Sequence, residues 1–203
     1  MGGRYIVGIT GASGSLYAEA VIRRLLKAGC EVHLCLTRAG QIVVREELPW
    51  QWPEGAAPEE IQAVLRSQFQ CGEELRYYDI HAIGARIASG SFRTDGMVVA
   101  PCSMGTLSAI AHGASHNLLE RAADVVLKER GKLVLAVRET PFSTIHLQNM
   151  LTLSQCGAVI MPACPSFYHA PSSLEELADF FAGRLLDQLG RSDDSIRRWE
   201  GID

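Results

Sequence analysis

The chain has 203 residues, a length that one domain with a sizeable core occupies, and its 47% apolar and 21% charged residues are those of an ordinary globular protein. The net charge of −4 is unfavourable for binding nucleic acid, and no apolar run approaches the ~20 residues of a membrane span. Six cysteines are scattered without a C-x-x-C pair, several of them in apolar runs. This usage predicts reduced, mostly buried thiols in a cytoplasmic protein.

Apolar runs that fit strands alternate with runs of helical spacing along the whole chain. The expected strands are Tyr5–Ile9, Glu31–Leu36, Gly96–Ala100, Lys132–Val137 and Ala158–Met161. The expected helices are Leu16–Lys27, Ala39–Leu48, Pro58–Phe69, Met104–Ala111, Asn117–Arg130, Ser143–Ser154 and Leu174–Leu189.

This alternation predicts an α/β fold, a Rossmann-like parallel sheet of five or six strands with helices on both faces, in three layers. Residues 1–190 are expected to form one domain, because no linker or internal repeat interrupts them. Residues 191–203 are expected to be a charged, loose tail that carries Trp199.

A Gly- and Ser-rich turn joins the first strand to the first helix. Gly8, Gly11 and Gly14 follow a G-x-x-G-x-x-G spacing, which differs from the dinucleotide fingerprint and from the P-loop. Glycines let a backbone approach a ligand, and a helix N-terminus presents free N–H groups to an anion. The turn predicts a phosphate-bearing ligand; a tight turn with no ligand is the alternative.

Ligands of such sheets bind at the carboxyl ends of the strands, so the segments that follow the strands are the candidate site. These segments are Thr10–Ser15, Thr37–Arg38, Pro101–Gly105, Arg138–Ser143 and Pro162–His169.

The turn after the third expected strand opens a helix with Ser103 as its predicted cap. Its free N–H groups could bind a carbonyl-rich or anionic edge of a ligand, or Ser103 could be a plain cap. Cys102 could be a nucleophile, but no histidine is placed locally to activate it, and an inert thiol is the better interpretation.

Three further groups carry charge that could serve a site. Arg121 and Lys128 are two helical turns apart and share a face that could hold a phosphate, or they form a solvated face with acidic partners at positions 120, 124 and 129. The pair Arg138 and Glu139 ends a strand and could bind and move a proton, or form a surface ion pair. Arg184 calls for an anionic partner or extends to water. Metal binding is not expected.

Taken together, three blocks resemble the UbiX-type flavin prenyltransferases. The blocks are GITGASGS (8–15), PCSMGTLSAIAHGASHNLLERAADVVLKER (101–130) and AVRETPFSTIHLQNMLTLSQCGAVIMPACPSFYH (136–169). The resemblance weakens in the insert at 50–78 and in the tail. The related cysteine decarboxylases of this fold carry PASANT and PxMNxxMW motifs, whereas this chain has PCSMGT and lacks the second motif.

The resemblance implies a metal-independent enzyme that joins a dimethylallyl group from dimethylallyl monophosphate to N5 and C6 of reduced FMN. The product, prenylated FMN, would serve a UbiD-type decarboxylase. It also implies a large homo-oligomer, often a dodecamer, with active sites between subunits. Two alternatives remain: a flavin-dependent decarboxylase of the same fold, and an FMN-binding subunit that stores or delivers cofactor.

The family's functional residues carry over to matching positions of this chain. The implied catalytic residues are Glu139, Glu47 and Ser13, with Ser13 near flavin N5. The implied FMN ligands are Gly11, Ala12, Ser13, Thr37, Cys102, Ser103, Met104, Gly105 and Arg138. The implied prenyl-phosphate ligands are Ser89, Gly90, Arg121, Lys128, Tyr168 and Arg184, together with the tail aromatic Trp199 that helps to close the pocket.

Overall fold

The computed structural model describes residues 2–192, 196, 198, 199 and 201. The strands are β1 (Arg4–Ile9), β2 (Glu31–Leu36), β3 (Leu75–Tyr78), β4 (Gly96–Cys102), β5 (Leu133–Val137) and β6 (Val159–Pro162). The helices are α1 (Ser15–Lys27), α2 (Arg38–Glu47), α3 (Pro58–Phe69), α4 (Met104–Ala111), α5 (Leu118–Lys128), α6 (Thr144–Gln155) and α7 (Leu174–Gln188), with a 3-10 turn, η1 (Arg86–Ala88).

All strand pairings are parallel, and the strand order is β3-β2-β1-β4-β5-β6. The order reverses between β1 and β4, which makes the crevice beyond their carboxyl ends the preferred ligand position of this topology. The five expected strands are confirmed. The β3 strand was not expected, and β4 runs two residues further than expected, through a cis peptide at Pro101.

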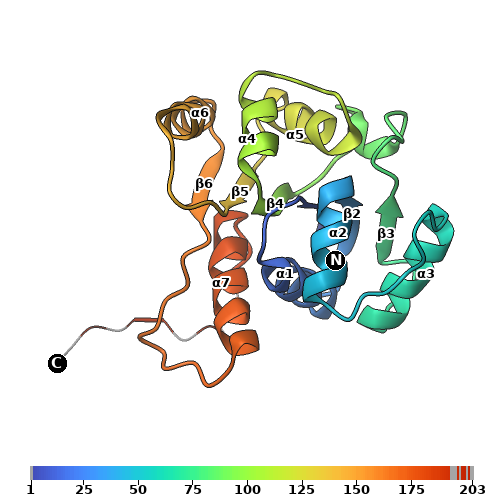
Figure 1. The fold of residues 1–203 in the computed structure, drawn as a ribbon, viewed down its shortest axis with the longest axis horizontal. Coiled ribbons are helices and arrows are strands. Elements are labelled where there is room, and N and C mark those ends of the chain that lie inside the picture. The colour runs from blue at the N-terminus through green and yellow to red at the C-terminus, as the bar shows by residue number, and fades with distance from the viewer. Residues whose placement is uncertain (1, 193–195, 197, 200, 202–203) are drawn as a thin grey trace.

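Helices cover both faces of the sheet, so the expected three-layer α/β fold is confirmed (Figure 1). One apolar cluster joins the sheet to α1, α2, α3 and α7, and a second joins its other face to α4, α5 and α6. Within the described part of the chain, no helix is long and apolar enough to cross a membrane.

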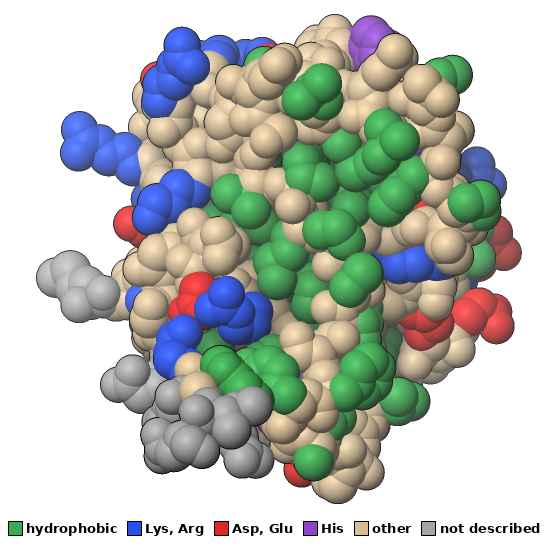
Figure 2. Space-filling view, turned by 90° about the vertical axis from the view of Figure 1, so that its left-hand side faces the viewer, with side chains coloured by type: hydrophobic (Ala, Val, Ile, Leu, Met, Phe, Trp, Pro, Cys, Tyr) green, Lys and Arg blue, Asp and Glu red, His purple; other side chains and the backbone are tan. Residues whose placement is uncertain are grey.

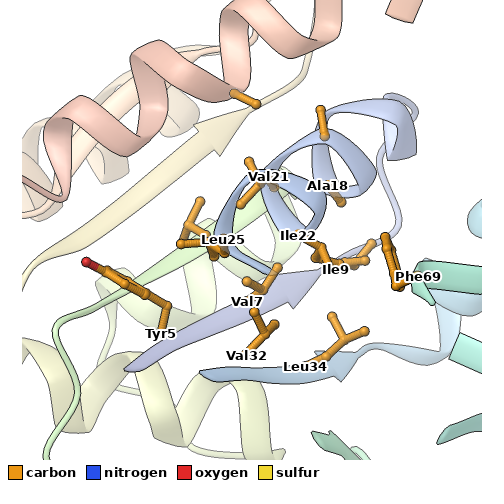
Figure 3. Packing of buried hydrophobic residues seen from close by; sticks show 14 of the residues in the cluster. Tyr5, Val7, Ile9, Ala18, Val21, Ile22, Leu25, Val32, Leu34 and Phe69 are labelled. Atoms are coloured by element: carbon orange, nitrogen blue, oxygen red, sulfur yellow. The ribbon is translucent and has the colours of Figure 1, made fainter. Parts of the chain in front are cut away.

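The packing of α1 on β1 and β2 positions the Gly- and Ser-rich turn (Figure 3). Val21, Ile22 and Leu25 of α1 are fully buried against the strands, which contribute Val7 and Leu34 among others. Each such side chain stabilises the fold by about 1.5–3 kcal/mol. The turn between β1 and α1 is therefore held at both ends by core packing.

The cysteines and the tail differ in part from expectation. All six cysteines are free, but Cys156 and Cys164 are exposed, so the prediction of mostly buried thiols is wrong at these positions. The tail is not wholly loose, because Ile196 is buried against α7, where a Cβ on Gly183 would collide with it. Among the described residues no group of three or more His, Cys, Asp or Glu could hold a metal ion.

Candidate functional site

A buried threonine ties together the two turns at the point where the strand order reverses. The Thr10 hydroxyl donates to the Pro101 carbonyl over 2.8 Å and accepts from the Ser103 backbone N–H over 2.8 Å. Thr10 begins one of the predicted candidate segments, but the sequence assigned it no ligand or catalytic role. Its position directly after β1, within the glycine motif, was the available signal, but only the structure shows the turn after β4 as its partner.

The N-terminus of α1 is capped by a side chain from another element. Glu47, the last residue of α2, accepts hydrogen bonds from the backbone N–H groups of Gly14 (2.9 Å) and Ser15 (2.7 Å). Burial alone would raise the pKa of Glu47, but hydrogen bonds from the Ser13 side chain and from these N–H groups outweigh it and lower the pKa. These two N–H groups, which the sequence assigned to a phosphate, bind the protein's own carboxylate instead.

A third turn, after β5, reaches the same place through Arg138. Its Nε donates to the Ser13 carbonyl over 3.0 Å, and its backbone N–H donates to the Cys102 carbonyl. The neighbouring Glu139 is exposed and accepts from the Thr140 backbone N–H over 3.0 Å. Each of these two side chains thus has its own partner, and the structure brings Ser13, Glu47 and Arg138 together at one edge of the sheet.

The start of α4 presents backbone groups beside these turns. Ser103 caps the helix by accepting from the Thr106 N–H over 3.4 Å. Met104 is buried, whereas Gly105 is exposed with open space where a side chain would lie. Cys102 is fully buried, and burial raises the pKa of its thiol to about 12, which favours the interpretation as an inert, protonated thiol.

The remaining predicted flavin ligands lie along the adjoining turns. Thr37 caps α2 by accepting from the Gly40 N–H over 3.0 Å, so its hydroxyl already has one partner. Gly11 packs so closely on Ala39 that a Cβ would collide with the Ala39 methyl group. Ala12 is buried beside it. These contacts fix the path of the backbone after β1 and β2.

A first group of predicted phosphate ligands lies around α5. Arg121 Nε donates to the Ala88 carbonyl over 3.3 Å, and a Cβ placed on Gly90 would lie 2.9 Å from Lys128 Nζ. Ser89 precedes Gly90, and its hydroxyl lies 2.9 Å from that of Ser91. We call Ser89, Gly90, Arg121 and Lys128 the α5 cation group.

Gly90 and Lys128 of the α5 cation group lie near the amino ends of the strands. Gly90 lines a cavity of about 580 Å³ that is also lined by Gly3, Asp95 and Gly131, which precede β1, β4 and β5. The flavin candidates lie beyond the carboxyl ends of these same strands. One chain therefore holds Lys128 and the flavin candidates toward opposite edges of its sheet.

A second group lies on α7 and the segments that flank it. Tyr168 packs edge-on against Trp199 of the tail, with ring centres 5.6 Å apart, and against Phe180, 5.5 Å away. Arg184 is 43% exposed and pairs with Asp187 over 2.6 Å. We call Tyr168, Arg184 and Trp199 the α7 group. Because α5 and α7 pack on opposite faces of the sheet, the two groups do not meet within one chain.

Comparisons with known proteins place the chain in a family. The flavoprotein family model matches residues 2–186. The flavin prenyltransferase UbiX of Halalkalibacterium halodurans is 48% identical, over 97% of this chain and 93% of that protein. The chain belongs to the UbiX flavin prenyltransferase family. The resemblance of the three sequence blocks is thereby confirmed.

Two solved structures of UbiX-type proteins share the fold over essentially the whole chain. One is AnUbiX (PadA1) in complex with FMN and dimethylallyl pyrophosphate, with 37% identity, a TM-score of 0.86 and complete coverage of both chains. The other is a dodecameric FMN-dependent Ubix-like decarboxylase from Escherichia coli O157:H7, with 39% identity, a TM-score of 0.84 and coverage of 98% and 100%. The UbiX family assignment thus holds for sequence and fold alike.

Proposed function

We propose that this protein is a flavin prenyltransferase that joins the dimethylallyl group of dimethylallyl monophosphate to N5 and C6 of reduced FMN. The observation that carries the proposal is 48% identity to a UbiX flavin prenyltransferase over 97% of the chain. Every residue to which the resemblance assigns a role is present. The product, prenylated FMN, passes to a UbiD-type decarboxylase.

The turns at the carboxyl edge fit FMN by their donors. Exposed backbone at Gly11, Ser13 and Gly105 allows close approach of a planar ring, and the Arg138 guanidinium, held by the Ser13 carbonyl, offers further N–H groups. Ala12, Thr37 and Cys102–Met104 complete the proposed FMN contacts. Reduced FMN supplies the electron-rich ring that accepts the prenyl group.

Two acidic residues have different roles in this proposal: Glu139 transfers a proton, and Glu47 orients Ser13. Glu139 is exposed beside the flavin turn and is the proposed relay for the proton that leaves C6. Glu47 stays ionised, because its hydrogen bonds lower its pKa, and it fixes the Ser13 side chain near N5. Ser13 and Glu47 therefore orient the reaction centre while Glu139 moves the proton.

The departing phosphate is held by cations. Arg121, Lys128 and Arg184 stabilise its negative charge, and Tyr168 adds a hydroxyl donor. Ser89 and Gly90 contribute the turn beside Lys128. Trp199, packed against Tyr168, helps to exclude water from the allylic cation. No metal ion is required, because the three cations supply the positive charge.

A homo-oligomer completes the site. The Gly90 and Lys128 end of the α5 cation group lies toward the amino edge and the α7 group lies on the opposite face, so in this proposal a second copy supplies one of them to each flavin. The helix α6 offers a contact surface: it has no charged residue, and Ile145, Leu147 and Leu151 are each more than half exposed. Figure 2, viewed onto this side, shows hydrophobic side chains gathered in a broad patch. A dodecamer is the proposed assembly, as in the E. coli relative.

The proposed location is the cytoplasm. Six free thiols fit a reducing compartment, and two of them, Cys156 and Cys164, are exposed to it. Reduced FMN, the proposed acceptor, also requires such conditions.

One experiment tests the proposed function directly. The protein is incubated anaerobically with reduced FMN and dimethylallyl monophosphate, and the flavin that is released is weighed by mass spectrometry. We expect a flavin heavier by one five-carbon unit. Unmodified FMN, from protein that demonstrably binds it, would favour a storage subunit or a flavin-dependent decarboxylase, the activity that the name of the E. coli relative gives. Of these two, only the decarboxylase would release carbon dioxide from a thiol-bearing acid.

A further inference from the structure

Each of the three proposed phosphate cations is paired with a carboxylate of its own helix or of the residue that ends it. The partner follows one to three positions later in every case. The pairs are Arg121–Asp124 at 2.8 Å, Lys128–Glu129, and Arg184–Asp187 at 2.6 Å. The pairs of Arg121 and Lys128 are formally neutral, whereas Asp187 is shared by Arg184 and Arg198 and lowers the formal charge of that group from +2 to +1. A phosphate that reaches these cations therefore meets charge that is already partly compensated.

Asp187 is the most firmly held of these carboxylates. Its side chain is only 10% exposed, against 31% for Asp124 and 51% for Glu129. It accepts from Arg184 Nη1 and, over 3.1 Å at each oxygen, from both terminal nitrogens of Arg198. Hydrogen bonding to Arg198 is the main reason that the pKa of Asp187 is lowered, so this carboxylate carries its charge at every pH of interest.

Asp187 also connects Arg184 to the part of the tail that reaches the site. Arg198 is bound to Asp187, and the next residue, Trp199, packs against Tyr168. The carboxylate thus sets both the position of the Arg184 guanidinium and the electrostatic potential beside it. The side chain of Arg184 remains 43% exposed, so it can still face a ligand.

The charge of the leaving group makes this arrangement selective. A phosphate monoester carries about two negative charges near neutral pH, and a diphosphate carries about one more. A fixed negative charge next to a binding cation repels both, but it repels the diphosphate more. It acts against the more highly charged donor without contacting either one.

We propose that Asp187 is a specificity-determining positioning residue, which favours dimethylallyl monophosphate over dimethylallyl diphosphate by limiting the positive charge around Arg184. This inference rests on the proposed function. It goes beyond that function by naming the residue that discriminates between the monophosphate donor and its diphosphate analogue. Asp187 touches neither donor and acts through Arg184.

The test compares the two donors in the Asp187→Asn variant, which keeps an acceptor oxygen and removes the charge. We expect the ratio of kcat/KM for the diphosphate to that for the monophosphate to rise roughly 5-fold, the scale of one unit charge acting at close range near a surface. A ratio equal to that of the unaltered protein would overturn the proposal, because a purely structural role slows both donors alike.

Two control variants separate charge from packing. Asp179→Asn removes the same charge from the same helix, at a residue paired with Arg24 and outside the α7 group, and it should leave the ratio unchanged. Asp187→Glu keeps the charge and should keep the ratio of the unaltered protein. A raised ratio in either control would contradict the assignment to the Asp187 charge.

A binding measurement makes the test independent of turnover. Calorimetric titration of the FMN-loaded protein with inorganic phosphate and with pyrophosphate gives two affinities, and the ratio of the pyrophosphate affinity to the phosphate affinity should be roughly 5-fold higher in Asp187→Asn than in the unaltered protein. Added salt should weaken this change. If the unaltered protein transfers no prenyl group, the proposed function fails; if it does and the ratio stays constant in both assays, only the role of Asp187 fails.

Discussion

In the turns after β1, β4 and β5, Thr10 and Arg138 are hydrogen-bonded to a different segment of the chain, whereas the cations on α5 and α7 are paired with carboxylates on their own helices or at the helix end. Thr10 binds the turn after β4, and Arg138 binds the turn after β1. By contrast, Arg121 binds Asp124, one turn away on the same helix surface.

The difference separates what one chain completes from what it leaves open. Long-range hydrogen bonds, of which those of Thr10 are buried or half-buried, fix the flavin turns before any ligand arrives, which is how binding geometry is preorganised. Partly exposed ion pairs within a helix contribute little to stability and rearrange easily. The cation groups are therefore the adaptable half of the site, which a second copy and the substrate bring into register.

The largest effect is expected at Glu139, the exposed acid in the turn after β5. Glu139→Gln should retain FMN but slow prenyl transfer at least ~100-fold, the scale of lost acid–base help. Single-turnover formation of prenylated FMN measures this rate, and flavin absorbance of the purified protein measures retention. Unchanged turnover would remove Glu139 from the proton relay.

The next effect belongs to the adaptable half. Arg184→Ala should reduce kcat/KM for dimethylallyl monophosphate roughly 30-fold, because a charged hydrogen bond to phosphate is lost, while FMN retention stays the same. Steady-state kinetics with varied prenyl donor gives the first quantity and bound-flavin content the second. Loss of FMN in this variant would show that Arg184 binds the flavin and that its assignment to the prenyl phosphate is wrong.

The preorganisation of the flavin turns is tested at the buried Thr10 hydroxyl, which joins the turns after β1 and β4. Thr10→Val keeps the shape but leaves the Ser103 N–H without the Thr10 oxygen, and should lower the free energy of unfolding by about 3 kcal/mol and weaken FMN retention. Thr10→Ser keeps the hydroxyl and is the matched control. Denaturant unfolding and flavin content measure both effects, and equal behaviour of the two variants would mean that the link is dispensable.

The smallest expected effect is the pH dependence of stability that comes from His33, a buried residue of β2. His33 is buried against Phe92, and burial lowers its pKa from 6.5 to about 4. As the pH falls, the His33 ring is protonated in the unfolded chain before it is protonated in the folded chain. The contribution of neutral His33 to the free energy of unfolding is therefore complete above pH 6.5 and is lost as the pH drops toward 4. Unfolding in urea should show a loss of about 2 kcal/mol between pH 7 and pH 5 from this group.

The variant His33→Gln supplies the control for this pH dependence. It removes the titrating ring and should flatten the change in stability between pH 7 and pH 5, whatever its effect at neutral pH. A dependence as steep as in the unaltered protein would assign the acid sensitivity to other groups, of which Glu31, 3.1 Å from the His33 ring, is the nearest candidate.

Local patterns were sufficient to predict most of the fold from the sequence. The strand Leu133–Val137 is a continuous apolar run, and Glu31–Leu36 is buried at every position after Glu31, because an inner parallel strand is covered on both faces. Strand Leu75–Tyr78 escaped prediction because it is a four-residue edge strand whose side chains are only alternately buried. Its signal is too short to separate it from the loop that surrounds it.

The contacts that assemble the site could not be predicted in the same way. The sequence offered Glu120, Asp124 and Glu129 as partners of the α5 cations. The structure confirms Asp124 and Glu129, whereas Glu120 accepts from the His116 backbone N–H and the Asn117 side chain. The link from Thr10 to Pro101 spans 91 positions, and the one from Glu47 to Gly14 spans 33. Such pairings depend on strand order, which one sequence does not encode in any local pattern. The assignment of residues to FMN and to prenyl phosphate remains a prediction from resemblance.

The carboxylate of Glu47 at the start of α1 has a consequence for pH–rate profiles. Because its hydrogen bonds lower its pKa, Glu47 does not change charge between pH 5 and pH 8. An inflection in that range would then report another group, and the prenyl phosphate, whose second ionisation falls near pH 6, is the first to consider. A change in rate with pH in this range would then report ionisation of the substrate's phosphate, while the Glu47 carboxylate beside Ser13 keeps one protonation state.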